Sequence, residues 1–188
     1  MDKLTRLTTE TRNENTKNFD QMSTIDILSV INDEDRKVAL AVQKVLPQIE
    51  QTVEATVQSF KKGGRLFYIG AGTSGRIGIL DAVECPPTFS TNPEFVQGKD
   101  AIEVAVEGAE DDADLGKKDL SDRNLTDRDI VIGIAASGRT PYVIGALKYA
   151  QEIGATTVSL TSNEKAIISE YADIVIEGVT GPEVITGS

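Results

Sequence analysis

The chain has 188 residues, 39% of them hydrophobic, and a formal net charge of −11. This length suits one domain with a sizeable core, and the acidic balance disfavours nonspecific binding to nucleic acid or to an acidic membrane. The chain has no histidine, which excludes a Ser-His-Asp triad, a Cys-His pair and a histidine metal site within it and leaves acid–base chemistry to Glu, Asp, Lys, Tyr or Cys.

The first 62 residues predict a polar arm followed by helices. Residues 1–22 contain no apolar run, so no signal peptide is predicted, and no window is long enough for a transmembrane helix. With Cys85 as the single cysteine, a reducing cytoplasm is the expected setting. "STIDILSVIND" begins with Ser23, a favourable N-cap, and the helical pattern continues with an interruption near Pro47 until Gly63-Gly64. We expect these helices to cover a sheet or a partner.

From Arg65 onward, strand and helix patterns alternate. The expected strands are 65–70, 94–98, 129–136, 156–162 and 172–179. The expected helices are 74–84, stopped by Pro86-Pro87, 100–108 as a helix or half of one, and 140–154, with Pro141 near its start. Such alternation predicts an α/β fold with a doubly wound parallel sheet that helices cover on both faces.

Two stretches of this region share one pattern. "GTSGRIGIL" at 72–80 and "AASGRTPYVIGAL" at 135–147 both run from a strand end, through Ser-Gly-Arg, into a helix. Small residues that only permit a tight turn would explain one such stretch. Two hydroxyl-rich turns at the carboxyl ends of parallel strands face one crevice, and they favour a bound anion.

The first stretch also fits a dinucleotide-binding fingerprint, since Gly70, Gly72 and Gly75 match G-x-G-x-x-G. That fingerprint needs an acidic residue about 20 residues later, where this sequence has the loop "TFSTNP". The hydroxyls of Thr73 and Ser74, beside the amides of a helix N-terminus, suit a compact phosphate monoester better. No P-loop motif is present. The sequence therefore favours a small phosphate over NAD.

The two turns resemble those of the sugar isomerase (SIS) domain, which binds phosphosugars through Ser/Thr loops. "GAGTSGRIGILDAVECPPTF", "AVEGAEDD", "VIGIAASGRTPYVIGAL", "GPEVITGS" and "STIDILSVINDED" together resemble the bacterial N-acetylmuramic acid 6-phosphate etherases. The chain is similar to the amino-terminal part of that family, whose members continue into further helices. The resemblance implies an arm with helices at 1–47 and an SIS domain at 48–188.

The resemblance also implies a reaction and its residues. The family cleaves the lactyl ether of N-acetylmuramic acid 6-phosphate to N-acetylglucosamine 6-phosphate and D-lactate, without a metal or organic cofactor. It implies Glu84 as proton donor and Glu110 as the second catalytic residue, although "EGAEDDAD" alone would be read as solvated surface. The implied phosphosugar-binding residues are Thr73, Ser74, Gly75, Ser137, Gly138 and Thr140, with Arg76, Glu107 and Arg139 as further candidates. The two arginines would hold the phosphate or the lactyl carboxylate, or pair with surface acids.

Two other functions stay open, a phosphosugar-binding module without activity and an aldose–ketose isomerase. "ECPPTF" favours the etherase over the isomerase. A helix that begins near Ser74 places Glu84 ten residues, or about 15 Å, farther along its axis. Either that helix is short and bends back, or Glu84 serves a site whose phosphate turns belong to another subunit, or Glu84 only caps or pairs locally and has no catalytic role. We expect the second arrangement, a homodimer with composite sites.

Overall fold

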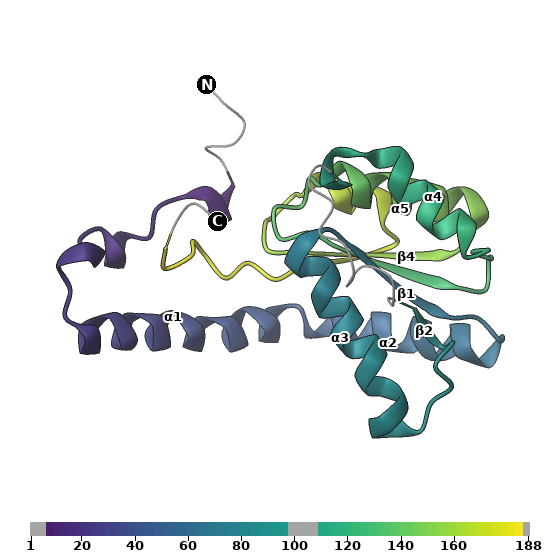
Figure 1. Ribbon diagram of the computed structural model, residues 1–188, viewed down its shortest axis with the longest axis horizontal. Helices are drawn as coiled ribbons and strands as arrows, with labels where there is room; N and C mark the ends of the chain where they lie inside the picture. Colours follow the sequence, from purple (N-terminus) through teal and green to yellow (C-terminus); the bar gives the residue numbers. More distant parts are fainter. Residues whose placement is uncertain (1–6, 98–108, 186–188) are drawn as a thin grey trace.

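The computed structural model describes residues 7–97 and 109–185 and contains a five-stranded parallel sheet (Figure 1). The strands are β1 (Leu66–Gly70), β2 (Val96–Gln97), β3 (Ile130–Ile134), β4 (Thr156–Thr161) and β5 (Ile174–Glu177). They lie in the order β2-β1-β3-β4-β5, and every neighbouring pair is parallel. The predicted fold class and all five predicted strands are confirmed. The helix expected at 100–108 lies outside the described residues.

Helices cover both faces of the sheet (Figure 1). Side chains alternate between the faces along each strand, so Leu66 and Phe67 enter different cores. Leu66 packs with residues of α2 (Leu46–Lys61) and α3 (Gly72–Phe89). Phe67 packs with residues of α4 (Ala113–Asp122), α5 (Pro141–Ile153) and the short helix η7 (Ile167–Tyr171). The sheet is therefore the middle of three layers.

The helix α1 (Thr24–Lys44) lies largely outside these layers and extends away from the sheet (Figure 1). Its predicted N-cap is confirmed, since Ser23 Oγ accepts from the Asp26 N–H at 3.3 Å. The predicted interruption is confirmed too, because α1 ends at Lys44 and Pro47 lies in the first turn of α2. Of the two helices, α2 covers the sheet as expected, whereas α1 buries only Ala41.

The expected stop at Pro86-Pro87 is wrong, because α3 continues through both prolines to Phe89. Each proline removes the N–H that would bond to the carbonyl four residues earlier. The carbonyls of Ala82 and Val83 therefore have no helical donor. They lie near the helix end, where water can bond to such carbonyls. No helix was predicted at 113–122, where the structure has α4, because the residues there are mostly polar. Its N-cap is Asp112, which accepts from the Leu115 N–H at 3.0 Å.

The N-terminal arm is more ordered than its polar sequence suggests. Residues 7–21 form three short 3-10 turns, η2 (Thr8–Glu10), η3 (Glu14–Thr16) and η4 (Phe19–Gln21). Asn13 is buried, and Thr9 hydrogen-bonds to Asn163 beyond the end of β4. The arm therefore docks on the sheet domain at the edge where the strands end.

A partly buried ion pair, between Arg65 and the buried Asp129, holds the opposite edge, where the strands begin. The Arg65 guanidinium contacts both carboxylate oxygens of Asp129, which also accept the backbone N–H groups of Arg65 and Thr126. Burial alone would raise the pKa of Asp129, but the Arg65 side chain and these amides outweigh burial and lower it.

Among the described helices, none is long and apolar enough to cross a membrane.

Candidate functional site

The two hydroxyl-rich turns lie at one edge of the sheet, after neighbouring strands. The first follows β1 and the second follows β3, and the last residues of these parallel strands, Gly70 and Ile134, are paired. The chain leaves β1 toward β2 on one side of the sheet, and the later strands are added on the other. Open α/β sheets bind ligands outside the carboxyl ends of the strands at such a switch point.

Gly70 allows the two turns to approach each other closely. A Cβ at this position would lie 2.8 Å from the Gly75 amide nitrogen and 3.1 Å from the Ile134 carbonyl oxygen. Both atoms belong to the backbone, so a side chain here would push the first turn away from β1 or β1 away from β3. Glycine therefore lets α3 begin directly over the strand end.

The first turn presents hydroxyls and amides at the start of α3. Thr73 is exposed, Ser74 is half-buried and Gly75 is buried. The N-cap, Ala71, has no side-chain oxygen to cap the first amides. The N–H groups of the first helical turn have no intrahelical acceptor and carry the positive end of the helix dipole. This end of α3 is therefore suited to an anion.

The second turn has the same character at the start of α5. Ser137, Arg139 and Thr140 are half-buried, and Gly138 is buried with φ +70°. Thr140 is the N-cap of α5, and its side chain makes no capping hydrogen bond. A Cβ at Gly138 would lie 2.3 Å from the Ala166 Cβ, so only glycine fits both the backbone conformation and the space.

A third polar strand end, which sequence reasoning missed, supports the second turn. β4 ends at Thr161, and three donors after or at this point reach the Ala136 carbonyl oxygen. These are Thr161 Oγ1 at 3.1 Å, the Ser162 N–H at 3.1 Å and Asn163 Nδ2 at 2.9 Å. The signal was present in "LTSN", a hydroxyl- and amide-rich stretch that follows a predicted strand in the same way as the two turns.

The structure brings Glu110 to the edge that holds the turns. Glu110 is exposed in η6 (Ala109–Asp111), a short helix that packs against α5 and precedes α4. The helices α4 and α5 cross near their starts, where a Cβ at Gly116 or Gly145 would meet the backbone of the other helix. Glu110 therefore lies on the same side of the molecule as the second turn. Glu107 lies outside the described residues.

Glu84 is not brought to the turns within one chain. It is exposed on α3, which is a single helix from Gly72 to Phe89. Ten residues separate it from Ser74, which corresponds to about 15 Å along the helix axis. The alternative of a short helix that bends back is therefore excluded. Figure 1 shows the second half of α3 leading away from the strand ends.

The two arginines differ in their surroundings. Arg76 is exposed on α3, and Arg139 is half-buried within the second turn. Within the described ranges neither makes an ion pair. Because Arg139 belongs to the second turn itself, it is the better placed of the two to bind an anion there.

The single cysteine lies next to Glu84 but is no candidate nucleophile. Tyr68 Oη donates to Asp81 Oδ2 at 2.8 Å under α3. Burial and the neighbouring Asp81 carboxylate raise the pKa of Tyr68, and the same causes raise the pKa of the Cys85 thiol. The thiol therefore stays protonated near neutral pH. Cys85 packs against the sheet core instead.

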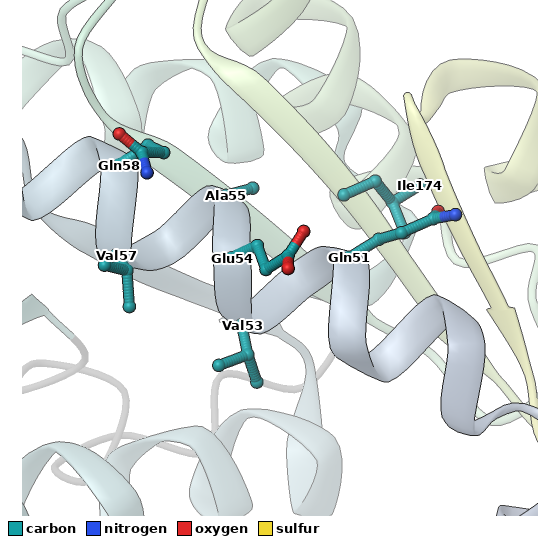
Figure 2. Close-up of a pocket in the computed structure, with 7 residues that line it drawn as sticks. All are labelled: Gln51, Val53, Glu54, Ala55, Val57, Gln58 and Ile174. Carbon is teal, nitrogen blue, oxygen red and sulfur yellow. The ribbon is translucent and has the colours of Figure 1, made fainter.

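A surface groove runs along α2, and its lining contains no residue of the two turns (Figure 2). It is lined by Gln51, Val53, Glu54, Ala55, Val57, Gln58 and Ile174. Ile174 is the first residue of β5 and pairs with Val158 near the middle of β4, so the groove lies beside the middle of the sheet. Figure 2 shows Val53 and Val57 pointing away from the sheet.

In residues 7–97 and 109–185, no cluster of three metal-ligating side chains occurs.

Comparison with known sequences gives consistent matches. Residues 48–151 match the family model described as the glucokinase regulatory protein N-terminal SIS domain. The chain is 58% identical over 98% of its length to an N-acetylmuramic acid 6-phosphate etherase of Geobacillus sp. (strain WCH70), and it spans 64% of that protein. It is 59% identical over 97% of its length to N-acetylmuramic acid 6-phosphate etherase 1 of Bacillus licheniformis, of which it spans 62%.

Solved structures share the fold at low identity. The phosphoheptose isomerase of Francisella tularensis aligns with a TM-score of 0.70 at 18% identity, over 83% of this chain and 86% of that one. The phosphoheptose isomerase of Neisseria gonorrhoeae aligns with a TM-score of 0.66 at 19% identity, over 81% and 83% of the two chains. At these identities the likeness supports the fold alone.

Proposed function

Because the chain belongs to the family of the glucokinase regulatory protein N-terminal SIS domain, we propose that its two turns bind the phosphate of a sugar phosphate. The hydroxyls and amides gather at the switch point of the sheet, at the starts of two helices. The net charge of −11 makes such local donors necessary for an anion. The proposed contacts are Thr73, Ser74, Gly75, Ser137, Gly138 and Thr140, with Arg139 next and Arg76 and Glu107 as outer candidates.

The proposed reaction is cleavage of the D-lactyl ether of N-acetylmuramic acid 6-phosphate. The observation that carries it is the high identity to proteins named for this activity over nearly the whole chain, which includes both turns, Glu84 and Glu110. We place the reaction in the cytoplasm, the compartment that the single cysteine suggests. It forms part of the breakdown of cell-wall amino sugars.

The chemistry needs two acid–base groups and no metal. In the open-chain aldehyde, the carbonyl makes the proton on carbon 2 acidic because it delocalises the carbanion. A base removes that proton, an acid protonates the ether oxygen, and D-lactate leaves with the bonding electrons of its carbon–oxygen bond. Water then adds to the unsaturated aldehyde at carbon 3 and gives N-acetylglucosamine 6-phosphate. A positioned carboxyl contributes roughly 10²–10⁴ to the rate of each proton transfer.

We assign the two carboxyls to Glu84 and Glu110, with Glu84 as the proton donor. Glu110 lies on the same side of the molecule as the second turn. Glu84 lies about 15 Å along α3 from Ser74, farther than a phosphosugar extends from its phosphate to carbon 3. Glu84 therefore serves the turns of a second copy, and the active unit is a homodimer with composite sites.

The exposed face of α3 has the symmetry that such a dimer requires. Thr73, Ile77, Leu80 and Glu84 fall on one stripe at helical spacing. Ile77 and Leu80 at its centre are 59% and 61% exposed. Thr73 precedes Ile77 by four residues, and Glu84 follows Leu80 by four. Two antiparallel copies paired around this centre place Glu84 of each opposite Thr73 of the other.

Charge supports this pairing. The carboxylates of Asp81 and Glu84 occupy the second half of α3, and Arg76 and the positive end of the helix dipole occupy the first. An antiparallel pair brings the acidic half of one helix against the positive half of the other. Ile77 and Leu80 of both copies would then be buried between the two helices, which favours association.

The direct test is incubation of the chain with N-acetylmuramic acid 6-phosphate and measurement of D-lactate. Release of lactate that is lost in both Glu84→Gln and Glu110→Gln supports the proposal. Saturable binding of the sugar phosphate without lactate would instead identify a binding module. No binding at all would overturn the assignment of the two turns.

Composite sites have a separate test. Glu84→Gln protein is mixed with protein that carries Ser74→Ala and Ser137→Ala, under conditions in which subunits exchange. Each parent is expected to be inactive, and the mixed dimer retains one intact site. Recovered lactate release supports sharing, whereas inactivity after verified exchange means that Glu84 and the turns act within one chain.

A further inference from the structure

One buried side chain joins the second turn to the N-terminal arm. Asn163 is 1% exposed. Its Nδ2 donates to the Ala136 carbonyl oxygen at 2.9 Å and to Thr9 Oγ1 at 3.0 Å. Its Oδ1 accepts from the Thr9 N–H at 3.4 Å. The Oδ1 atom therefore bonds to the arm alone, and the Nδ2 atom bonds to both the arm and the second turn.

Because the peptide bond is planar, the orientation of the Ala136 carbonyl also fixes the orientation of the Ser137 N–H in the turn. The bond between Ala136 and Ser137 is trans, so its C=O and N–H point in opposite directions. The carbonyl is held toward the end of β4 by its three donors, those of Thr161, Ser162 and Asn163. The Ser137 N–H is thereby directed away from β4, and within the described residues no acceptor meets it.

The next carbonyl of the turn is fixed in the same way. The Ile168 N–H donates to the Gly138 carbonyl oxygen at 3.0 Å, so the Arg139 N–H points away from η7. Glu177 holds the start of η7, because its Oε1 accepts from the Ala166 N–H at 3.2 Å and from Ser169 Oγ at 2.9 Å. The amides of Ser137 and Arg139 are thus fixed before any ligand arrives, as an anion site requires.

We propose that Asn163 is a positioning residue for the phosphate turn and that it makes phosphosugar affinity depend on the N-terminal arm through Thr9. The inference rests on the proposed function, since the ligand is the phosphate of a sugar phosphate at this turn. Asn163 acts through the Ala136–Ser137 peptide and makes no contact with the ligand. Without its Nδ2 donor, the peptide has fewer bonds to hold its orientation, and part of the binding energy is spent on ordering it.

The test is calorimetric titration of N-acetylglucosamine 6-phosphate into the chain and two variants. Asn163→Ala is expected to weaken binding by about 3- to 30-fold, the loss that one or two hydrogen bonds would cause. Thr9→Val keeps the side-chain shape but removes the Oγ1 acceptor, and it is expected to weaken binding by about two- to fivefold. The double variant should bind about as weakly as Asn163→Ala, because the residues act as one unit.

Thr157→Val is the matched control at the other end of β4. Thr157 is also buried, and its Oγ1 donates to Asp173 at 3.0 Å. This variant also loses the hydrogen bond that Thr157 Oγ1 accepts from the Asp173 N–H at 3.1 Å, and both bonds lie far from the turn, so it should lower the melting temperature and leave the affinity unchanged. Equal affinity of Asn163→Ala and Thr157→Val would overturn the inference. If Asn163→Ala does not fold, unchanged affinity in Thr9→Val overturns it.

A second readout detects the coupling itself. Because coupling between two sites is reciprocal, ligand at the turn should slow trypsin cleavage after Arg12, which is exposed in the arm. Protection should disappear in Asn163→Ala at saturating ligand. Protection that persists in this variant contradicts the role of Asn163. If the unaltered chain binds no phosphosugar, the proposed function fails and the inference with it, whereas normal binding with unchanged variants overturns the inference alone.

Discussion

Replacement of Gly138 by alanine should damage the second turn in a way that the structure allows to be estimated. Its φ of +70° costs a residue with a side chain about 1–2 kcal/mol. The added Cβ would also lie 2.3 Å from the Ala166 Cβ and 2.8 Å from Thr161 Oγ1, closer than nonbonded atoms approach. Relief of this overlap typically costs about 1–3 kcal/mol. The sum of about 2–5 kcal/mol is a large part of a typical domain stability of about 5–15 kcal/mol.

Gly154→Ala separates the two contributions. Gly154 also has a positive φ, +86°, but a Cβ there would approach the Asp127 Cβ only to 3.7 Å, an ordinary contact distance. This variant should therefore lose only the conformational part, about 1–2 kcal/mol. It follows α5 at the end away from the turns, so phosphosugar affinity should not change.

Urea unfolding followed by circular dichroism gives the free energies of unfolding, and calorimetry with N-acetylglucosamine 6-phosphate gives the affinities. Gly138→Ala should lose more stability than Gly154→Ala and should bind at least tenfold more weakly at a temperature where both are folded. Equal stability losses would show that Ala166 and Thr161 move aside without cost. Unchanged affinity in Gly138→Ala would refute the view that this turn holds the ligand.

Three further predictions test other parts of the structure. Ser74→Ala and Ser137→Ala should each weaken phosphosugar binding by about 1–3 kcal/mol if a hydrogen bond to the phosphate is lost, and unchanged calorimetric affinity in both would contradict the contacts. Asp129→Asn should cost about 3 kcal/mol in urea unfolding. Because the folded pKa of Asp129 is lowered, its stabilisation is complete above the unfolded value of about 3.9 and is lost as pH falls through the folded pKa. The pH dependence of unfolding should therefore be shallower in the variant at pH values below that unfolded value. Leu80→Asp should dissociate the dimer in sedimentation, whereas Leu28→Asp, at a similarly exposed leucine of α1, should not.

Local patterns in the sequence determined the elements and the chemistry of the turns. Ser23 marked the start of α1, Pro141 and Gly154 bounded α5, and alternating apolar runs marked every strand. These signals act within a few residues, so they can be read without the fold. The absence of histidine similarly limited the chemistry before any geometry was known. The stop predicted at Pro86-Pro87 was wrong because solvent near the helix end can satisfy the freed carbonyls, and the polar residues of α4 gave no helix signal that was recognised in the sequence.

Tertiary structure decided which of these pieces meet. The strand order placed the turns after β1 and β3 side by side, and no local signal specifies the order of strands. Asn163 reached both Ala136 and Thr9 although 154 residues separate it from Thr9. The straight course of α3 kept Glu84 away from the turns of its own chain. Such long-range contacts depend on the burial of whole faces of the sheet, which sums over many residues and cannot be read from any one of them.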